Sequence, residues 1–107
     1  MKICATAESD NLDAAVAQHF GKSPYFIFVD SVTMEWEVVE NPADRTEKGA
    51  GMQVAPILIE RDVDLLITGK VGTNTSQILA TAEIKVVQGV TGSVREALEE
   101  HKKMWTE

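Results

Sequence analysis

The chain contains 107 residues, 44% hydrophobic and 25% charged, which is the composition of one globular domain spanning residues 1–107. Its formal net charge of −7 argues against nucleic acid as a partner, because phosphate binding requires a basic surface. An anionic ligand is still compatible with this charge, since charges more than about 8 Å apart are largely screened at physiological salt. The single cysteine excludes an internal disulfide and favours a reducing, cytoplasmic location. We expect no signal peptide, because no basic segment precedes an apolar stretch, and no membrane span, because no apolar run approaches roughly 20 residues.

The first half of the chain predicts three strands and one short helical segment. Residues 2–6 have the composition of a buried strand, and residues 25–29 are aromatic and β-branched, which is typical of a central strand. Residues 35–40 partly alternate between polar and apolar, as expected of a strand near a sheet edge. Between the first two strands, residues 12–20 predict a helical turn that ends at Gly21.

The second half alternates between predicted helices and strands. It starts with residues 43–51, a polar and glycine-rich stretch that predicts a flexible loop. In the helix that follows, Pro56 requires either a start near residues 53–55 or a kink, because an interior proline loses a backbone hydrogen bond. The remaining predicted elements are a strand at 64–68, a helix that has N-cap candidates at 73–76 and runs to about residue 82, a strand at 84–87, and a helix at 94–102 that starts with a Ser93–Glu96 capping box.

The order of these elements predicts an α/β fold. Repeated strand–helix units in the second half imply parallel strands with right-handed crossovers, whereas the hairpin in the first half adds antiparallel pairing. We therefore expect a mixed five-stranded sheet that is flanked by helices on both faces. The loops at residues 69–74 and 89–92 should open into a crevice at the carboxyl ends of the parallel strands.

Several segments occur in the order that is typical of one known family. They are Met1–Ile3, His19–Phe26, Gly49–Gly51, Gly69–Gly72 and Ile84–Leu98. Over nearly the whole chain, they resemble the dinitrogenase iron–molybdenum cofactor biosynthesis family. The resemblance implies a ribonuclease H-like fold. It also implies binding of an anionic iron–sulfur or iron–molybdenum-type cluster that passes between cluster donor and acceptor proteins.

Two positions depart from the pattern of that family. Thr73 stands where a proline often follows the Gly-x-x-Gly turn, and Lys48 stands in a loop where relatives often carry a histidine. The missing histidine removes a possible second ligand, so the sequence favours either a cluster that is held loosely and can be transferred or a relative that has lost cluster binding.

His19 and Cys4 are the candidate metal ligands. Imidazole suits iron and other transition metals, and thiolate is the preferred soft ligand of a cluster. The alternatives are that His19 packs at a turn and that Cys4 is a core residue, since free cysteines are often buried. One cysteine cannot supply the four thiolates of an ordinary iron–sulfur cluster. A cluster would therefore arrive preassembled, keep other ligands, or be shared between subunits.

The glycine turns are the candidate anion site. Residues 69–74 lie where a strand passes into a helix, and backbone amides at a helix N-terminus together with one lysine can bind an anion. The alternative is an ordinary tight turn, and residues 49–51 are either a lid over this site or a flexible connection. The full set of predicted cofactor-binding residues is His19, Gly21, Lys22, Gly49, Gly51, Gly69, Lys70, Gly72, Thr73 and Asn74.

Catalysis is not predicted. A nuclease, suggested only by the ribonuclease H-like fold, needs several carboxylates that converge on two metals, and the predicted strand ends do not provide them. The alternative to cluster carriage is a metal-free interaction or regulatory module, with Trp36, Met104 and Trp105 as contact residues. We expect a monomer or a weak dimer.

Overall fold

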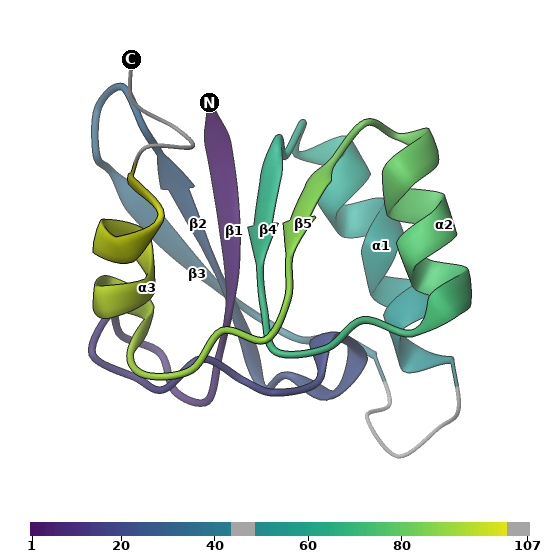
Figure 1. Cartoon of the computed structure of the whole chain (residues 1–107), viewed down its shortest axis with the longest axis horizontal. Helices are drawn as coiled ribbons and strands as arrows, with labels where there is room; N and C mark the ends of the chain where they lie inside the picture. The colour runs from purple at the N-terminus through teal and green to yellow at the C-terminus, as the bar shows by residue number, and fades with distance from the viewer. Residues whose placement is uncertain (44–48, 103–107) are drawn as a thin grey trace.

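A mixed sheet lies at the centre of the molecule, as the computed structural model of residues 1–43 and 49–102 shows (Figure 1). Its strands are β1 (Lys2–Ala7), β2 (Tyr25–Asp30), β3 (Trp36–Glu40), β4 (Leu65–Ile67) and β5 (Lys85–Val87). They lie in the order β3-β2-β1-β4-β5. β2 pairs antiparallel with both β1 and β3, whereas β4 pairs parallel with both β1 and β5. The predicted mixed five-stranded α/β fold is therefore confirmed.

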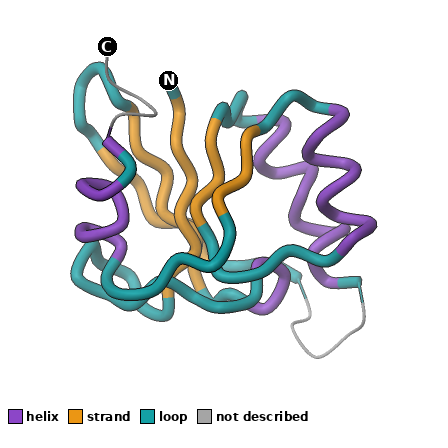
Figure 2. The backbone as a smooth tube through the Cα atoms, viewed as in Figure 1, coloured by secondary structure: helices purple, strands orange, loops and turns teal. Residues whose placement is uncertain are grey.

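Helices cover both faces of this sheet, as predicted (Figures 1 and 2). They are α1 (Ala50–Glu60), α2 (Thr73–Thr81), α3 (Val94–Glu100) and the short 3-10 helix η1 (Phe20–Lys22). Successive side chains of β1 point to opposite faces of the sheet, so the core consists of two clusters. Ile3 and Ala5 pack in the cluster that contains the buried residues of α3, whereas Cys4 packs in the cluster of α1 and α2. None of the described helices is long and apolar enough to cross a membrane.

The predicted helical turn over residues 12–20 is wrong. After a turn at residues 12–13, this segment forms isolated β-bridges at Ala15, Val16 and His19, and its backbone bonds to partners that are distant in the sequence. The amide of Val16 donates to the carbonyl of Gly92 at 2.8 Å, and the amide of Ala17 donates to the carbonyl of Thr6 at 3.1 Å. Because these tertiary hydrogen bonds already satisfy the backbone, a helix would add no further backbone hydrogen bonds there. Helical structure begins only at η1.

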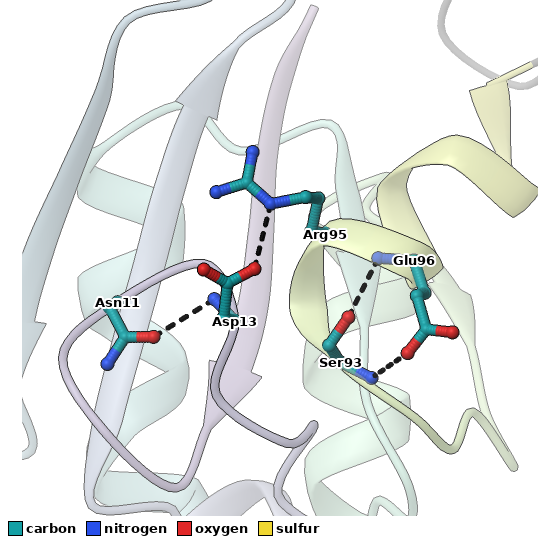
Figure 3. A network of polar contacts seen from close by, with 5 residues as sticks. All are labelled: Asn11, Asp13, Ser93, Arg95 and Glu96. Atoms are coloured by element: carbon teal, nitrogen blue, oxygen red, sulfur yellow. Dashed lines mark hydrogen bonds and ion pairs between the residues drawn. The ribbon is translucent and has the colours of Figure 1, made fainter.

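Side chains pin the start of this segment to α3 (Figure 3). The Nε of Arg95 lies 2.9 Å from the Oδ1 of Asp13, and the amide of Asp13 donates to the Oδ1 of Asn11 at 3.0 Å. The predicted capping box is confirmed. The amide of Glu96 donates to the Oγ of Ser93 at 3.1 Å, and the amide of Ser93 donates to the Oε1 of Glu96 at 3.0 Å.

Helix α1 starts earlier than predicted, at Ala50, so the expected start near residues 53–55 is wrong. Pro56 lies inside the helix, where its ring crowds the carbonyl of Met52, four residues earlier. Both residues are exposed, so that carbonyl is on the solvent side, where water can replace the lost amide. Ala50 and Gly51 belong to the helix rather than to the predicted loop, and residues 44–48 lie outside the described residues.

Helix α2 starts at Thr73, so the predicted N-cap among residues 73–76 is wrong. Gly72 occupies the N-cap position, and no side chain caps the helix. The N-cap candidates at residues 73–76 all lie inside the first turn and a half. The first backbone amides of α2 are therefore left to other partners.

Candidate functional site

A hollow of about 270 Å³ lies at the carboxyl edge of the sheet, where the first turns of α1 and α2 meet η1. This is the edge at which β1 and β4 both end, because the two strands are parallel. The residues that line the hollow are His19, Phe20, Gly21, Lys22, Gly49, Ala50, Gly51, Lys70, Gly72 and Thr75. The predicted crevice is therefore present only in part, because Lys70 and Gly72 of the predicted loop at 69–74 line the hollow, whereas no residue of the loop at 89–92 does.

Most of the predicted cofactor-binding residues meet in this hollow, although they come from separate parts of the chain. Those that line it are His19, Gly21, Lys22, Gly49, Gly51, Lys70 and Gly72. Gly69, Thr73 and Asn74 do not line it. Gly69 instead allows a close approach of two backbones, since an added Cβ would lie 2.5 Å from the Cα of Gln18.

A backbone connection carries His19 to the hollow. His19 forms an isolated parallel bridge with Lys70, and the amide of Phe20 donates to the carbonyl of Lys70 at 2.9 Å. Phe20 is buried and packs against Phe26 with ring centroids 5.6 Å apart, which anchors η1 to the core. The side chains of His19 and Lys70 are left exposed at the rim.

Two glycines allow η1, α1 and α2 to meet closely. A Cβ added to Gly21 would overlap the backbone of Gly51, so any larger residue would force η1 and α1 apart. A Cβ added to Gly51 would lie 2.8 Å from the Oγ1 of Thr75 on α2. Glycine at these two positions is therefore a steric requirement of the site.

Asn41 holds η1 from the other side. Its Nδ2 donates to the carbonyls of Gly21 at 3.0 Å and Ser23 at 2.9 Å. Its Oδ1 accepts the amide of Ala43 at 2.8 Å. A single nearly buried side chain thus fixes both the wall of the hollow and the first residues of the connection to α1.

The hollow is locally positive in a chain of net charge −7. Lys22 and Lys70 line it, and none of the described residues that line it is acidic. Both α1 and α2 begin there, without a side-chain cap and without an acidic residue in the first turn. The unsatisfied amides and the positive end of each helix dipole favour an anion. The arrangement therefore suits an anionic ligand.

The two predicted metal ligands lie in different environments. His19 lines the hollow and is exposed, so its imidazole is accessible to a metal. Cys4 is fully buried in the core behind it, and this burial raises the pKa of its thiol, so the thiol stays neutral. Cys4 is therefore not an accessible ligand in this structure. Across residues 1–43 and 49–102, no group of three His, Cys, Asp or Glu side chains is placed to hold a metal ion.

The sequence profile of the dinitrogenase iron–molybdenum cofactor family matches residues 1–104. The chain belongs to this family. The description of this family names an iron–molybdenum cofactor. A comparison with curated protein sequences finds no significant match.

Solved structures of similar proteins share the fold of this family member. The apo form of the orange protein from Desulfovibrio gigas is 37% identical, with a TM-score of 0.89 over 96% of this chain and 88% of that chain. A Thermotoga protein that is described as a NifB protein of the DUF35 family is 30% identical. Its TM-score is 0.81 over 95% of this chain and 87% of that chain. Proteins that are only 30% and 37% identical to this chain therefore adopt the same fold.

A second hollow of about 250 Å³ in this family member is unsuited to an anion. Its lining includes three carboxylates, from Asp30, Glu35 and Glu37, against two cations, Lys2 and Arg61. Its one guanidinium, from Arg61, is already engaged, because it pairs with Glu37 at 3.0 Å and lies 4.5 Å from the ring centroid of Phe28. The hollow between η1, α1 and α2 is thus the better candidate site.

Among the lining residues, the sequence singled out neither Phe20 nor Thr75, whereas Ala50 lies in the possible lid at residues 49–51. Phe20 lies in the segment His19–Phe26, which carries the family resemblance, so that segment could have indicated Phe20 as a site residue. Thr75 was interpreted only as a possible N-cap. Nothing local in the sequence places its side chain against Gly51, because that contact joins two different helices.

Proposed function

We propose that this protein binds an anionic iron–sulfur or molybdenum-containing cluster in the hollow and carries it between donor and acceptor proteins. The observation that supports this most is the meeting of two uncapped helix N-termini with Lys22 and Lys70, in a lining where none of the described residues carries a carboxylate. Such a lining neutralises a bound anion without a dedicated cage. The family description supplies the link to iron and molybdenum.

In this proposal, His19 is the one metal ligand among the described residues that line the hollow. One exchangeable ligand holds a preassembled cluster weakly, whereas the ordinary set of four thiolates holds it firmly. Weak attachment suits a carrier, since the cargo has to leave again. The role that we propose is therefore transfer and not catalysis.

A metal-free interaction module is the second candidate. Of its predicted contact residues, Met104 and Trp105 lie outside the described residues. Exposed apolar side chains gather at the connection between β2 and β3, where Val32 is 83% exposed, Met34 51% and Trp36 46%. This connection lies at the edge of the sheet opposite the hollow, because Asp30 pairs with Lys2 at the start of β1. A partner that binds at this edge would leave the hollow open.

Anaerobic reconstitution with iron, sulfide and molybdate tests the proposal, with visible absorbance and metal analysis as readouts. We expect the wild-type protein to retain metal and the His19→Ala variant to lose most of it. His101→Ala is the matched control, because this second histidine contacts the carbonyl of Ala97 on α3 and lies outside the hollow. Absence of metal in the wild-type protein, or equal metal in His19→Ala, would contradict cluster carriage.

A further inference from the structure

The hydroxyl of Thr75 is an exception among the buried polar side chains. Thr75 is 5% exposed and lines the hollow, yet its Oγ1 has no hydrogen-bond partner among the described residues. The other buried hydroxyls are all satisfied. The Oγ1 of Thr6 donates to the carbonyl of Ala17 at 2.9 Å, the Oγ1 of Thr68 lies 2.9 Å from that of Thr6, and the Oγ of Ser23 donates to the carbonyl of Tyr25 at 2.6 Å.

An orphaned buried hydroxyl points to a ligand because it costs free energy in the protein alone. Burial removes the hydroxyl from bulk water, and no protein acceptor replaces the lost hydrogen bond. Native structures satisfy nearly all buried polar groups, so an exception at a hollow requires an explanation. A ligand atom that accepts a hydrogen bond provides one.

Gly51 leaves space in front of this hydroxyl. Since a Cβ at position 51 would lie 2.8 Å from the Oγ1 of Thr75, any other residue there would crowd the donor. Gly51 and Thr75 both line the hollow, and each lies in the first turn of its helix. The hydroxyl therefore adds a side-chain donor to the two sets of first-turn amides.

We propose that Thr75 donates a hydrogen bond to an oxygen atom of the bound anion and makes the hollow selective for a tetrahedral oxoanion such as molybdate. This inference rests on the proposed function and specifies its ligand. A hydroxyl donates more strongly to a charged oxygen than to sulfur, which is a weak acceptor. Lys22 and Lys70 balance the charge, while the amides of α1 and α2 contact the remaining oxygens. The oxygen belongs either to free molybdate or to an oxo group on a cluster.

Equilibrium dialysis of molybdate against the wild-type protein and the Thr75→Val variant tests the inference. Valine keeps the shape of the side chain and removes only the hydroxyl. We expect about tenfold weaker binding or more, which corresponds to about 1.4 kcal/mol. Thr75→Ser should restore binding. Thr81→Val is the matched control on the same helix, because the hydroxyl of Thr81 is exposed and donates to the carbonyl of Gln77 at 2.9 Å.

The thermal stability of the ligand-free variants separates a binding role from a structural role. Removal of an orphaned buried hydroxyl should leave the Tm of Thr75→Val unchanged or raise it, because nothing in the protein loses a partner. A lower Tm with unchanged molybdate affinity would overturn the inference. Equal molybdate affinity in the wild-type protein and Thr75→Val would overturn it as well.

The anaerobic reconstitution distinguishes failure of this inference from failure of the proposed function. If the wild-type protein binds a cluster but no free molybdate, and Thr75→Val takes up equal metal, the oxoanion inference is overturned and cluster carriage stands. If Thr75→Val takes up less metal than Thr81→Val, the hydroxyl contacts the cluster itself, which supports the inference. Thr75-dependent binding of molybdate without any cluster uptake supports the oxoanion site and contradicts cluster carriage.

Discussion

His19 and Lys70 are joined by a parallel β-bridge, although they come from the segment after β1 and the loop after β4. The bridge places an imidazole and an ammonium group at the rim of one hollow. Because a backbone interaction makes the connection, both side chains are left exposed for a ligand. The carboxyl edge of the sheet thus combines a metal-binding side chain with an anion-binding surface.

We expect Lys70→Gln to weaken anion binding without unfolding the protein. Lys70 is exposed at the rim, so the loss should be about two- to fivefold, in line with the modest strength of exposed charge interactions. Titration calorimetry with molybdate at low salt and at 0.5 M NaCl (roughly a 4 Å screening length) measures it. Lys85→Gln is the control, because Lys85 is exposed at the start of β5, opposite the hollow. Equal losses in both variants would indicate a nonspecific charge effect.

Gly21→Ala should destabilise the fold, whereas Gly72→Ala should have little effect. A Cβ at position 21 would overlap the backbone of Gly51, and relief of that overlap should cost about 1–3 kcal/mol in the free energy of unfolding. A Cβ at position 72 would meet no atom within 4 Å. Urea denaturation of the two variants provides the comparison. Equal midpoints would refute the close contact between η1 and α1.

The thiol of Cys4 should not react with a thiol reagent while the protein is folded. Its complete burial raises the pKa, so no thiolate is available at neutral pH, and the reagent cannot reach the sulfur. Reaction should follow only after unfolding in guanidinium chloride. Rapid labelling of the native protein would show that the strand opens, and Cys4 would again become a candidate ligand.

The capping box of α3 should make stability depend on pH through Glu96. Hydrogen bonds from the backbone amide and side chain of Ser93 hold the pKa of this carboxyl below its usual value. Because the pKa of Glu96 is lower in the folded state, its carboxylate stabilises the fold at any pH above the unfolded-state pKa of about 4.3. This contribution is lost as the pH falls through the folded-state pKa. Glu96→Gln should therefore lower the free energy of unfolding at pH 7, but not at a pH below the folded-state pKa of Glu96. Ser93→Ala should cost about 1 kcal/mol at neutral pH.

Chemical denaturation at several pH values follows both variants. A difference between Glu96→Gln and the wild-type protein that stays constant down to low pH would contradict the role of the carboxylate. Arg95→Ala is a useful comparison, because it removes the neighbouring ion pair with Asp13 and leaves the capping box intact (Figure 3).

The mixed sheet and the place of the hollow were predictable because parallel βα units put successive loops at one edge of a sheet. The path of residues 12–20 was not. Ala14, Val16 and Ala17 are as compatible with a helix as with an extended chain, and the partners that decide between them are distant. Val16 bonds to Gly92, and Ala17 bonds to Thr6. The start of α1 was misplaced because the solvent-facing position of Pro56 is a property of the folded helix.

The site was predictable where a residue type carries its own chemistry and unpredictable where packing decides. His19, Lys70 and the glycines were accessible from the sequence, since each has a chemical or steric role by itself. Cys4 could be either a ligand or a core residue until its side of β1 was known. The role of Thr75 depends on its contact with Gly51, and a threonine in the first turn of a helix has no local feature that indicates it.

The central claim is that an anionic cluster binds in the hollow, and amide NMR of the reconstituted protein tests it most directly. A diamagnetic sample should shift the backbone amides of His19, Gly51, Lys70 and Thr75, whereas a paramagnetic sample should broaden them. The amides at the opposite edge of the sheet, such as Val32 and Lys85, should stay unchanged. Changes that centre on the β2–β3 connection, or a spectrum identical to that of the metal-free protein, would contradict the claim.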